Sequence, residues 1–484
     1  MNYGIILRFL GFTTTIITGC MMIPLAVSFF SGSVDAFAFV ISIIISAAVA
    51  AAFFFFGRKA EMSRMGTTEV YASVSLSWIA SSAISAVPYF IYGAAPTYTD
   101  AFFESMSGYT TTGSTIFPQI DILPYSILLW RAMTHWLGGM GIICFTLVMI
   151  PLTGAGGFKI FRAESPGMIH EKMTPRIRQT AVYLWLIYVG LTLILTGLLI
   201  LGGMNFFDAV CHGMSTIATG GFSTRSESIA YYHSAYIEWV IIVFMFVSGA
   251  NFVLHFYALK DNSLRRYFGD PEFRFYAIVV SVLSLLVTID LFAGGFASFL
   301  ASLRAGLFHV TCFVTTTGFA ANNYDLWPGF SKSVLFICMF LGGCAGSTAG
   351  GIKQARLLVM SNSIRQRFRQ MLNPKTVVIL PAASHTSDPN VISSCMAFFG
   401  LYIIVFIAGA FALSLFESDL ITAISVAASA IGNVGPAFGR LGAAENFAAL
   451  APETKWILSF LMLCGRLELY TLFSLFSKIF SKEV

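Results

Sequence analysis

Long apolar runs alternate with shorter polar stretches along almost the whole chain. The runs lie near residues 4–30, 35–56, 69–93, 126–150, 180–203, 236–259, 274–296, 333–360, 392–415 and 455–477. A helix needs roughly 20 apolar residues to cross a bilayer, whereas a barrel strand alternates residue by residue. The first run is too long for a cleaved leader, so we expect it to be retained. The pattern predicts ten membrane-crossing helices, with both chain ends on one side.

From residue 69 onward, the apolar runs form four pairs. The stretch between the two runs of each pair contains a short, partly apolar segment followed by a turn that contains glycine. The four stretches read DAFFESMSGYTTTGST at 100–115, DAVCHGMSTIATGGFST at 208–224, LFHVTCFVTTTGFAANN at 307–323 and ITAISVAASAIGNVGPAFG at 421–439. We align the turn glycines Gly113, Gly220, Gly318 and Gly435. A later glycine in the next run follows each: Gly139, Gly249, Gly343 and Gly465.

This spacing indicates an internal repeat. It divides the chain into unit 1 (69–150), unit 2 (180–260), unit 3 (274–360) and unit 4 (392–478), preceded by two extra transmembrane helices at 1–56. Each unit contains two crossings, so successive units point the same way. Many secondary transporters use inverted repeats instead. The sequence therefore predicts an all-α membrane protein with four pseudo-symmetric repeats around a central pore.

The short segments explain what the turns can do. A helix of about 11 residues is roughly 16 Å long, half of the hydrocarbon core, so it can enter the membrane but not cross it. Non-helical backbone at that depth must line a cavity or be buried in protein. Four such turns around an axis predict rings of carbonyl oxygens that replace the hydration shell of a cation. The alternative reading of the turns is four ordinary extracellular loops.

The predicted filter contains three residues from each turn and no carboxylate, which argues against an acidic-ring pore of the calcium type. The residues are Thr111, Thr112, Gly113, Ala218, Thr219, Gly220, Thr316, Thr317, Gly318, Asn433, Val434 and Gly435.

Composition and charge place the chain in the membrane with a defined orientation. Hydrophobic residues make up 57% and charged residues 11%, against about 25% charged in soluble domains, and the mean hydropathy is +0.80. The stretches 57–64, 151–179, 260–274 and 353–375, with the chain ends, carry 21 of the 28 lysines and arginines. The positive-inside rule then predicts that both termini are cytoplasmic.

No pattern for enzymatic chemistry is visible. The eight cysteines lie in apolar context without a CxxC pair, and the seven histidines are scattered. We interpret the cysteines as small buried residues rather than disulfides or zinc ligands. We therefore expect neither catalysis nor a bound nucleotide, and no nucleic-acid partner.

The run at 333–360 contains LGGCAGSTAGGIK, Leu341–Lys353. It does not match a phosphate loop, since Ile352 separates the last glycine from Lys353. Interior glycines cost a helix about 1 kcal/mol each relative to alanine, so a break beneath the filter is expected. Close helix packing through small residues is the alternative.

The predicted gate combines this broken loop with Arg466, an ionisable residue inside the last run. Carbonyls of the loop are the expected partners of Arg466, with a snorkelling or structural arginine as the alternative. The gate residues are Gly346, Ser347, Thr348, Ala349, Gly350, Gly351 and Arg466.

The turns TTTGST, ATGGFST, TTTGFA and GNVGP, in this order, resemble those of the Trk/Ktr/HKT superfamily of potassium transporters, and the likeness covers almost the whole chain. The resemblance implies four M1–P–M2 repeats, like those of K⁺ channels. It also implies uptake of K⁺ and Rb⁺ in preference to Na⁺ across the bacterial inner membrane, with glycine at all four filter positions. Asn433, Val434 and Pro436 in the fourth turn depart from the TxG pattern, as is typical of this family.

The resemblance further implies a homodimer and a cytosolic ring of TrkA-type nucleotide-binding (NAD/ATP) subunits that regulates a gated pore. The basic loops at 151–179 and 353–375 offer a docking face for such subunits, and they could equally contact anionic membrane lipid. The membrane potential can drive the uptake, since it contributes about 2.3 kcal/mol per charge per 100 mV. Symport of K⁺ with H⁺ or Na⁺ by alternating access is the alternative function.

Overall fold

The computed structural model describes residues 2–61, 65–153, 177–372, 389–417, 419–443 and 445–473, and helices connected by turns and loops make up most of them. Within these ranges the only β pairing is an isolated bridge between Leu341 and Ile352. The prediction of an all-helical protein is confirmed. Six helices are long and apolar enough to cross a membrane: α1 (Tyr3–Ser31), α2 (Ala36–Gly57), α3 (Thr67–Tyr92), α7 (Ile177–Leu201), α12 (Pro271–Ala293) and α16 (Pro389–Leu413).

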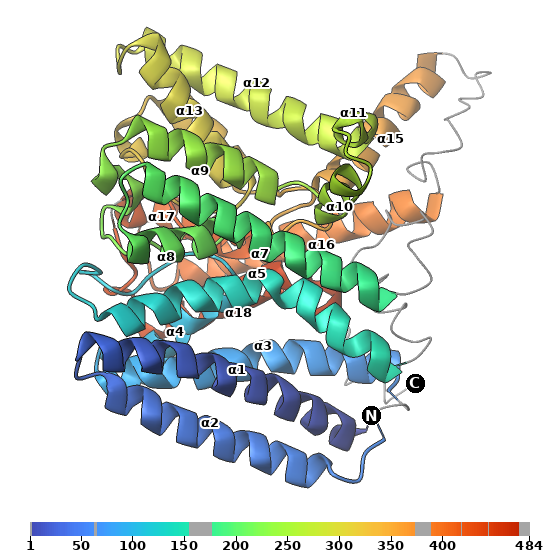
Figure 1. Cartoon of the computed structure of the whole chain (residues 1–484). Coiled ribbons are helices and arrows are strands. Elements are labelled where there is room, and N and C mark those ends of the chain that lie inside the picture. Colours follow the sequence, from blue (N-terminus) through green and yellow to red (C-terminus); the bar gives the residue numbers. More distant parts are fainter. Residues whose placement is uncertain are drawn as a thin grey trace.

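Four shorter helices, here called the pore helices, coincide with the repeated partly apolar segments. They are α4 (Tyr98–Tyr109), α8 (Phe206–Ile217), α13 (Phe299–Val314) and α17 (Leu420–Gly432). Each begins at a polar N-cap whose side chain accepts a hydrogen bond from a backbone N–H of the first turn; the caps are Thr97, Asn205, Ser298 and Asp419. Such caps satisfy donors that the helix itself leaves unpaired. All four pore helices lie toward the left-hand end of the longer helices (Figure 1).

The helices that follow the four turns differ from one another. They are α5 (Tyr125–Thr153) in unit 1, α9 (Ala235–Ser248) with α10 (Phe252–Lys260) in unit 2, α14 (Gly329–Cys338) with α15 (Gln354–Leu372) in unit 3, and α18 (Pro452–Arg466) in unit 4. Within the described residues, α5 is the one of these helices that continues as a single long helix. Including the bent α9–α10 pair, length and composition identify up to seven candidate crossings among the described residues. The number of ten stays a prediction.

A continuous crossing at 236–259 was the wrong expectation, because α9 and α10 meet at 96°. Gly249 ends α9, and Asn251 caps α10 with its side chain. Backbone from unit 3 fills the break: the Cys344 N–H donates to the Gly249 carbonyl at 2.8 Å, and the Phe252 N–H donates to the Gly346 carbonyl at 3.1 Å. These tertiary bonds replace the helical bonds lost at the bend, which explains how an apolar sequence tolerates it.

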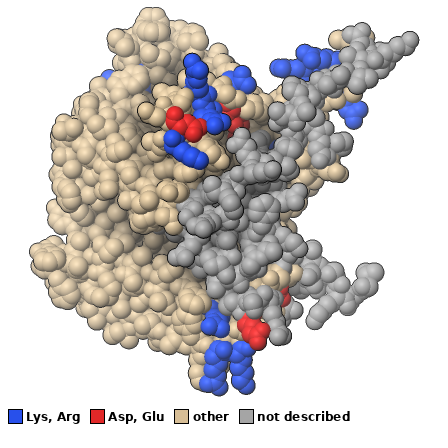
Figure 2. All heavy atoms as spheres, turned by 45° about the vertical axis from the view of Figure 1, so that its right-hand side comes forward, with Lys and Arg blue, Asp and Glu red and all other residues tan. Residues whose placement is uncertain are grey.

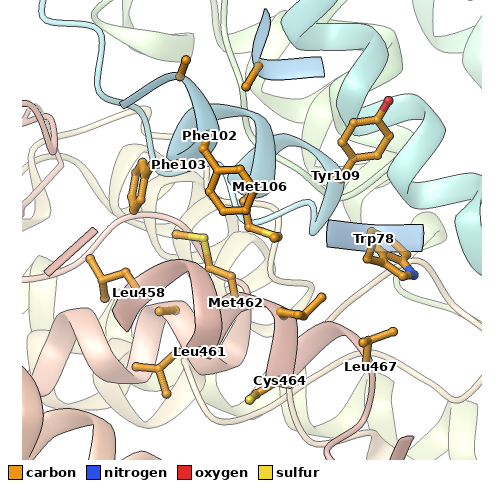
Figure 3. Packing of buried hydrophobic residues seen from close by; sticks show 14 of the residues in the cluster. Trp78, Phe102, Phe103, Met106, Tyr109, Leu458, Leu461, Met462, Cys464 and Leu467 are labelled. Carbon is orange, nitrogen blue, oxygen red and sulfur yellow. The ribbon is translucent and has the colours of Figure 1, made fainter. Parts of the chain in front are cut away.

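Units 1 and 4 pack directly against each other. In Figure 3, Phe102 and Met106 of α4 face Leu458 and Met462 of α18, and all four belong to one buried apolar cluster. The short helix α11 (Arg265–Gly269) joins α10 to α12. The helices α1 and α2 lie together at one edge of the molecule, beside α3 (Figure 1). The boundaries of the four units stay a prediction.

Exposed basic side chains gather at one end of the molecule. Figure 2 shows them over α10–α12, after α2 and on α15; exposed examples are Lys59, Arg265 and Arg365. The basic loop expected at 151–179 lies mostly outside the described residues, and the basic segment at 353–375 is largely α15. The cytoplasmic orientation of this end remains a prediction.

Candidate functional site

The four turns share one backbone geometry. The first residue of each is in the left-handed region, with φ of 52° at Thr111, 54° at Thr219, 54° at Thr316 and 55° at Asn433. Two residues later, each turn has a glycine with φ between 82° and 102°. We call residues 111–113, 219–221, 316–318 and 433–435 turns 1 to 4. A β-branched residue at positive φ is uncommon, so its recurrence indicates that the surrounding structure imposes it.

The turns contact one another in a closed ring. A Cβ on Gly113 would lie 2.3 Å from the Gly220 carbonyl oxygen, and one on Gly318 would lie 2.3 Å from the oxygen of Val434. The remaining two contacts complete the circle: Gly221 against the Thr317 oxygen at 2.1 Å, and Gly435 against the Thr112 oxygen at 2.4 Å. A side chain at any of these positions would require the neighbouring backbone to shift. The glycines are thus required by close approach of four chains as well as by their φ angles.

The structure corrects the alignment of turn 2. Gly221, not Gly220, matches Gly113, because Gly221 has the positive φ of 82° and faces the next turn. Gly220 instead matches Thr112: its N–H donates to the Ser215 carbonyl, five residues earlier, as the Thr112 N–H donates to Ser107. Ala218 is the C-cap of α8 and precedes the turn. Two consecutive glycines made the sequence alignment ambiguous by one residue.

All twelve residues predicted for the filter lie in or next to this ring, and nearly all are buried. Turns 4 and 1 are also joined by side chains, since Asn433 Nδ2 donates to Thr112 Oγ1 at 3.1 Å and Ser114 Oγ donates to the Gly435 carbonyl at 3.0 Å. Asn433, which replaces a threonine in turn 4, thereby bonds to a threonine of turn 1. The departure of turn 4 from the TxG pattern leaves its backbone geometry unchanged.

The chemistry at the ring is that of backbone oxygens. Each pore helix ends at its turn, so the negative ends of four helix dipoles converge there. Among the described residues there is no group of three or more His, Cys, Asp or Glu that could hold a metal ion. Uncharged oxygen ligands of this kind suit a weakly held monovalent cation better than a tightly bound divalent one.

The glycine-rich segment of unit 3 lies directly against the turns. It is not helical, because α14 ends at Cys338 and α15 begins at Gln354. The Gly350 N–H donates to Thr316 Oγ1 at 2.7 Å, and Thr219 Oγ1 donates to Thr348 Oγ1 at 3.2 Å. A Cβ on Gly350 would lie 2.6 Å from the Gly432 carbonyl oxygen. The loop therefore contacts turns 2 and 3 and the end of the pore helix that leads into turn 4.

Arg466 bonds this loop across to another unit. Its Nη1 donates to the Thr348 carbonyl at 2.7 Å, and its Nη2 donates to the Gly138 carbonyl of α5 at 2.9 Å. The side chain is buried, with its guanidinium carbon 5.7 Å from the ring centre of Trp78. The expected contact between Arg466 and a loop carbonyl is present, and the side chain does not extend to the surface.

Further bonds fix both ends of the loop. Glu272, at the start of α12, accepts hydrogen bonds from the Ala345 N–H at 2.6 Å and the Ala355 N–H at 3.0 Å. The Gln354 side chain donates to the Gly342 carbonyl at 2.7 Å, and Lys353 Nζ donates to the Ala349 carbonyl. Hydrogen bonds thus hold both ends of the loop in this structure.

The sequence analysis did not identify three ion pairs that involve the pore helices α4 and α8. Arg131 and Glu104 form an ion pair at 2.8 Å, and Lys455 and Asp100 form another at 2.6 Å. A third pair joins Arg225 to the largely buried Asp208 at 2.8 Å. An ionisable residue next to an apolar run was the available signal, but the sequence does not show which acid it meets.

Comparisons with known proteins find matches over nearly the whole chain. A family model described as "TrkH: Cation transport protein" matches residues 35–483. The Trk system potassium uptake protein TrkH of Escherichia coli (strain K12) is 37% identical over 100% of both chains. The Trk system potassium uptake protein TrkG of the same strain is 30% identical over 97% of both. The crystal structure of the potassium transporter TrkH from Vibrio parahaemolyticus superposes with a TM-score of 0.89, at 32% identity over 100% of each chain.

Proposed function

Because the chain belongs to the TrkH family of cation transport proteins, we propose that it takes up K⁺ across the bacterial inner membrane through a selective, gated pore. The family consists of transporters rather than enzymes. Residues 111–113, 219–221, 316–318 and 433–435 form the filter, which favours K⁺ and Rb⁺ over Na⁺. K⁺ is the transported substrate, and the chain itself binds no nucleotide.

One observation carries this proposal: the four turns contact one another in a closed ring in which a glycine of each faces a carbonyl oxygen of the next. A ring of backbone oxygens can replace the hydration shell of K⁺, and the number and field of those dipoles discriminate against Na⁺. The converging helix dipoles attract a cation. They do so without a carboxylate in the ring, which would hold the cation too tightly.

The loop at residues 346–351 and Arg466 form the gate. The loop bonds to turns 2 and 3, and Arg466 ties its Thr348 carbonyl to α5. Conduction requires the loop to leave this position, which breaks the hydrogen bonds of a buried guanidinium. Such bonds are charge-assisted and stronger than bonds between neutral groups, so the closed state is favoured until a partner shifts the equilibrium.

The membrane potential drives entry, and regulation comes from a cytosolic nucleotide-binding ring that docks on the basic end of a homodimer. The exposed arginines on α15, which include Arg365, Arg367 and Arg369, support this docking site because α15 continues directly from the loop. Both termini are cytoplasmic. Anionic lipid can occupy the same basic surface when no subunit is bound.

Purified protein in a planar bilayer tests the proposal. We expect unitary current steps, a reversal potential close to that of K⁺, and reduced discrimination against Na⁺ in Gly113→Ser. Gly197→Ser is the matched control, because a Cβ on Gly197 in α7 meets no atom within 4 Å. A reversal potential that Gly113→Ser leaves unchanged contradicts the filter assignment. Flux without unitary steps, coupled to H⁺ or Na⁺, favours alternating-access symport instead.

A further inference from the structure

One buried ion pair lies immediately beside the ring, between units 1 and 2. Glu104 belongs to the pore helix α4 and Arg131 to α5, and their side chains are 0% and 1% exposed. Arg131 Nε donates to Glu104 Oε1 at 2.8 Å. Glu104 also accepts from the Ile116 N–H at 2.8 Å and from Thr115 Oγ1 at 3.0 Å. The carboxylate thus holds the residues that follow turn 1.

The guanidinium of Arg131 reaches the neighbouring unit. Its Nη2 donates to Thr115 Oγ1 at 3.1 Å, and its Nη1 donates to the Ser223 carbonyl at 3.0 Å. Ser223 follows turn 2, so one planar group bonds to the chain beyond two successive turns. Aromatic rings enclose it: the guanidinium carbon lies 4.2 Å from the ring centre of Phe222 and 5.3 Å from that of Phe117.

The aromatic packing around Arg131 extends to turn 2. Phe222 is adjacent to Gly221, and its ring lies on the imidazole of His135, with ring centres 4.0 Å apart and planes at 14°. A Cβ on Gly220 would lie 2.3 Å from Nδ1 of His135. Arg131, Phe222 and His135 therefore form a rigid packing behind the backbone of turn 2.

Within the described residues, the bonds that join the chains beyond turns 2 and 3, and beyond turns 3 and 4, include no ion pair, although the Asp325 carboxylate accepts from the Ala443 N–H at 3.1 Å. Between units 2 and 3, the Ile229 N–H donates to the Ala320 carbonyl at 3.0 Å. Between units 3 and 4, Tyr324 Oη donates to the Ala437 carbonyl at 3.0 Å. The pair Lys455–Asp100 also joins two units, but Asp100 lies in the first turn of α4, at the end of that helix away from the ring.

We infer that the Glu104–Arg131 pair is a strut that sets the spacing between turns 1 and 2, and so determines how well the ring discriminates K⁺ from Na⁺. The inference rests on the proposed function of the ring as a filter. Glu104 and Arg131 are positioning residues: they act through the backbone of residues 115–116 and 223, and neither is assigned to coordinate the ion.

Stability alone does not account for this pair. Burying two charges carries a desolvation cost that often matches their attraction, so a buried ion pair is weak evidence for stability. The geometry is also more specific than stability requires, since three guanidinium nitrogens meet three different partners on two units. A planar fork with several bonds fixes distance and angle together, which lysine or a neutral side chain cannot reproduce.

The test compares ion selectivity of Arg131→Met, Glu104→Gln and the double variant, as reversal potentials of purified protein in bilayers with K⁺ and Na⁺ on opposite sides. Each single variant is expected to lower the K⁺ to Na⁺ permeability ratio by roughly tenfold, since carbonyl spacing governs the field at the ion. The permeability ratio of the double variant should be no lower than that of either single variant, because each single substitution already removes the same strut. Arg131→Lys should recover only part of the ratio.

Arg304→Met is the matched control. Arg304 pairs with Glu238 at the same 2.8 Å, from pore helix α13 to α9, with the Arg304 side chain 30% exposed. Within the described residues, neither side chain bonds to a turn. It should lower thermal stability without a change in permeability ratio. If Arg131→Met does not fold, Glu104→Gln carries the test, because its amide oxygen still accepts from the Ile116 N–H.

Three outcomes would overturn the strut or the filter. Folded strut variants with an unchanged permeability ratio, beside a shifted ratio in Gly113→Ser, contradict the strut and leave the filter in place. An unchanged ratio in Gly113→Ser as well contradicts the filter itself. A reduced ratio in the Arg304→Met control would show that selectivity follows general destabilisation, and would also overturn the strut.

Discussion

The ring of turns and the helices beneath it are built on opposite plans. At the ring, four units adopt one geometry, with φ near 54° at the first residue and a glycine two positions on. Beneath it, the helix after each turn is different: α5 is continuous, α9 and α10 meet at 96°, α14 and α15 are separated by a loop, and α18 ends at Arg466. Equivalence suits a site that surrounds one ion, whereas asymmetry suits a part that moves.

This difference indicates a division of labour. Substitutions in the ring should change which ion passes, and substitutions beneath it should change how often the path is open. The break in unit 2 receives the loop of unit 3 through bonds in both directions, from Cys344 to Gly249 and from Phe252 to Gly346. The bend between α9 and α10 and the loop of unit 3 therefore form one hydrogen-bonded structure.

The largest expected effect is that of Gly221→Ala. A methyl group there would lie 2.1 Å from the Thr317 oxygen, at a φ of 82° that L residues rarely adopt. We expect loss of K⁺ uptake in a potassium-uptake-deficient bacterial strain, with protein still present in the membrane. Gly190→Ala in α7 is the control, because a Cβ there meets nothing within 4 Å. Normal uptake in Gly221→Ala would break the equivalence of the four turns.

Arg466→Ala should have the next largest effect, and of the opposite sign. Loss of the bonds to the Thr348 and Gly138 carbonyls frees the loop, and charge-assisted bonds contribute about 1.5–3 kcal/mol each. Basal K⁺ flux into liposomes, measured without a partner subunit, is expected to rise by roughly tenfold or more. The permeability ratio should stay unchanged. Unchanged or lower flux from folded protein would contradict the gate.

Thr348→Val should raise basal flux by a smaller amount. The change keeps the shape of the side chain but removes its hydrogen bond to the Ile217 carbonyl at 3.1 Å and its bond with Thr219. A neutral hydrogen bond contributes about 0.5–1.5 kcal/mol, so a rise of a few-fold is expected in the same liposome assay. Ser361→Ala on α15 is the control. A lowered permeability ratio in Thr348→Val would contradict the separation of gate from filter.

Thr97→Ala should have the smallest effect. Thr97 caps α4 by accepting from the Asp100 N–H at 3.2 Å, and loss of such a cap costs about 1 kcal/mol. We expect a fall of about 1 °C in the melting temperature of the detergent-solubilised protein, with K⁺ uptake and selectivity retained. Loss of selectivity would mean that the far end of the pore helix also positions the ring.

Much of the fold follows from the hydrophobic pattern. Long apolar runs and partly apolar half-length segments identify the helices because they follow from composition and period alone. The contact of Arg466 with the glycine-rich loop was also accessible, since a buried guanidinium needs acceptors and a non-helical loop offers free carbonyls. Both inferences use only local chemistry.

The rest depends on contacts between distant segments. From the sequence, either Gly220 or Gly221 could align with Gly113. The approach of the Thr317 oxygen to Gly221 distinguishes them. The bend between α9 and α10 needs backbone from unit 3 to satisfy it. Similarly, nothing local pairs Glu104 with Arg131, which are 27 residues apart.

The central claim is that the four turns surround one cation path, and Rb⁺ tests it most directly. Anomalous scattering from crystals grown in Rb⁺ should show a peak between the carbonyl oxygens of Thr112, Gly220, Thr317 and Val434, weakened in Gly113→Ser. A map with Rb⁺ bound elsewhere on the protein and no peak within the ring would contradict the account.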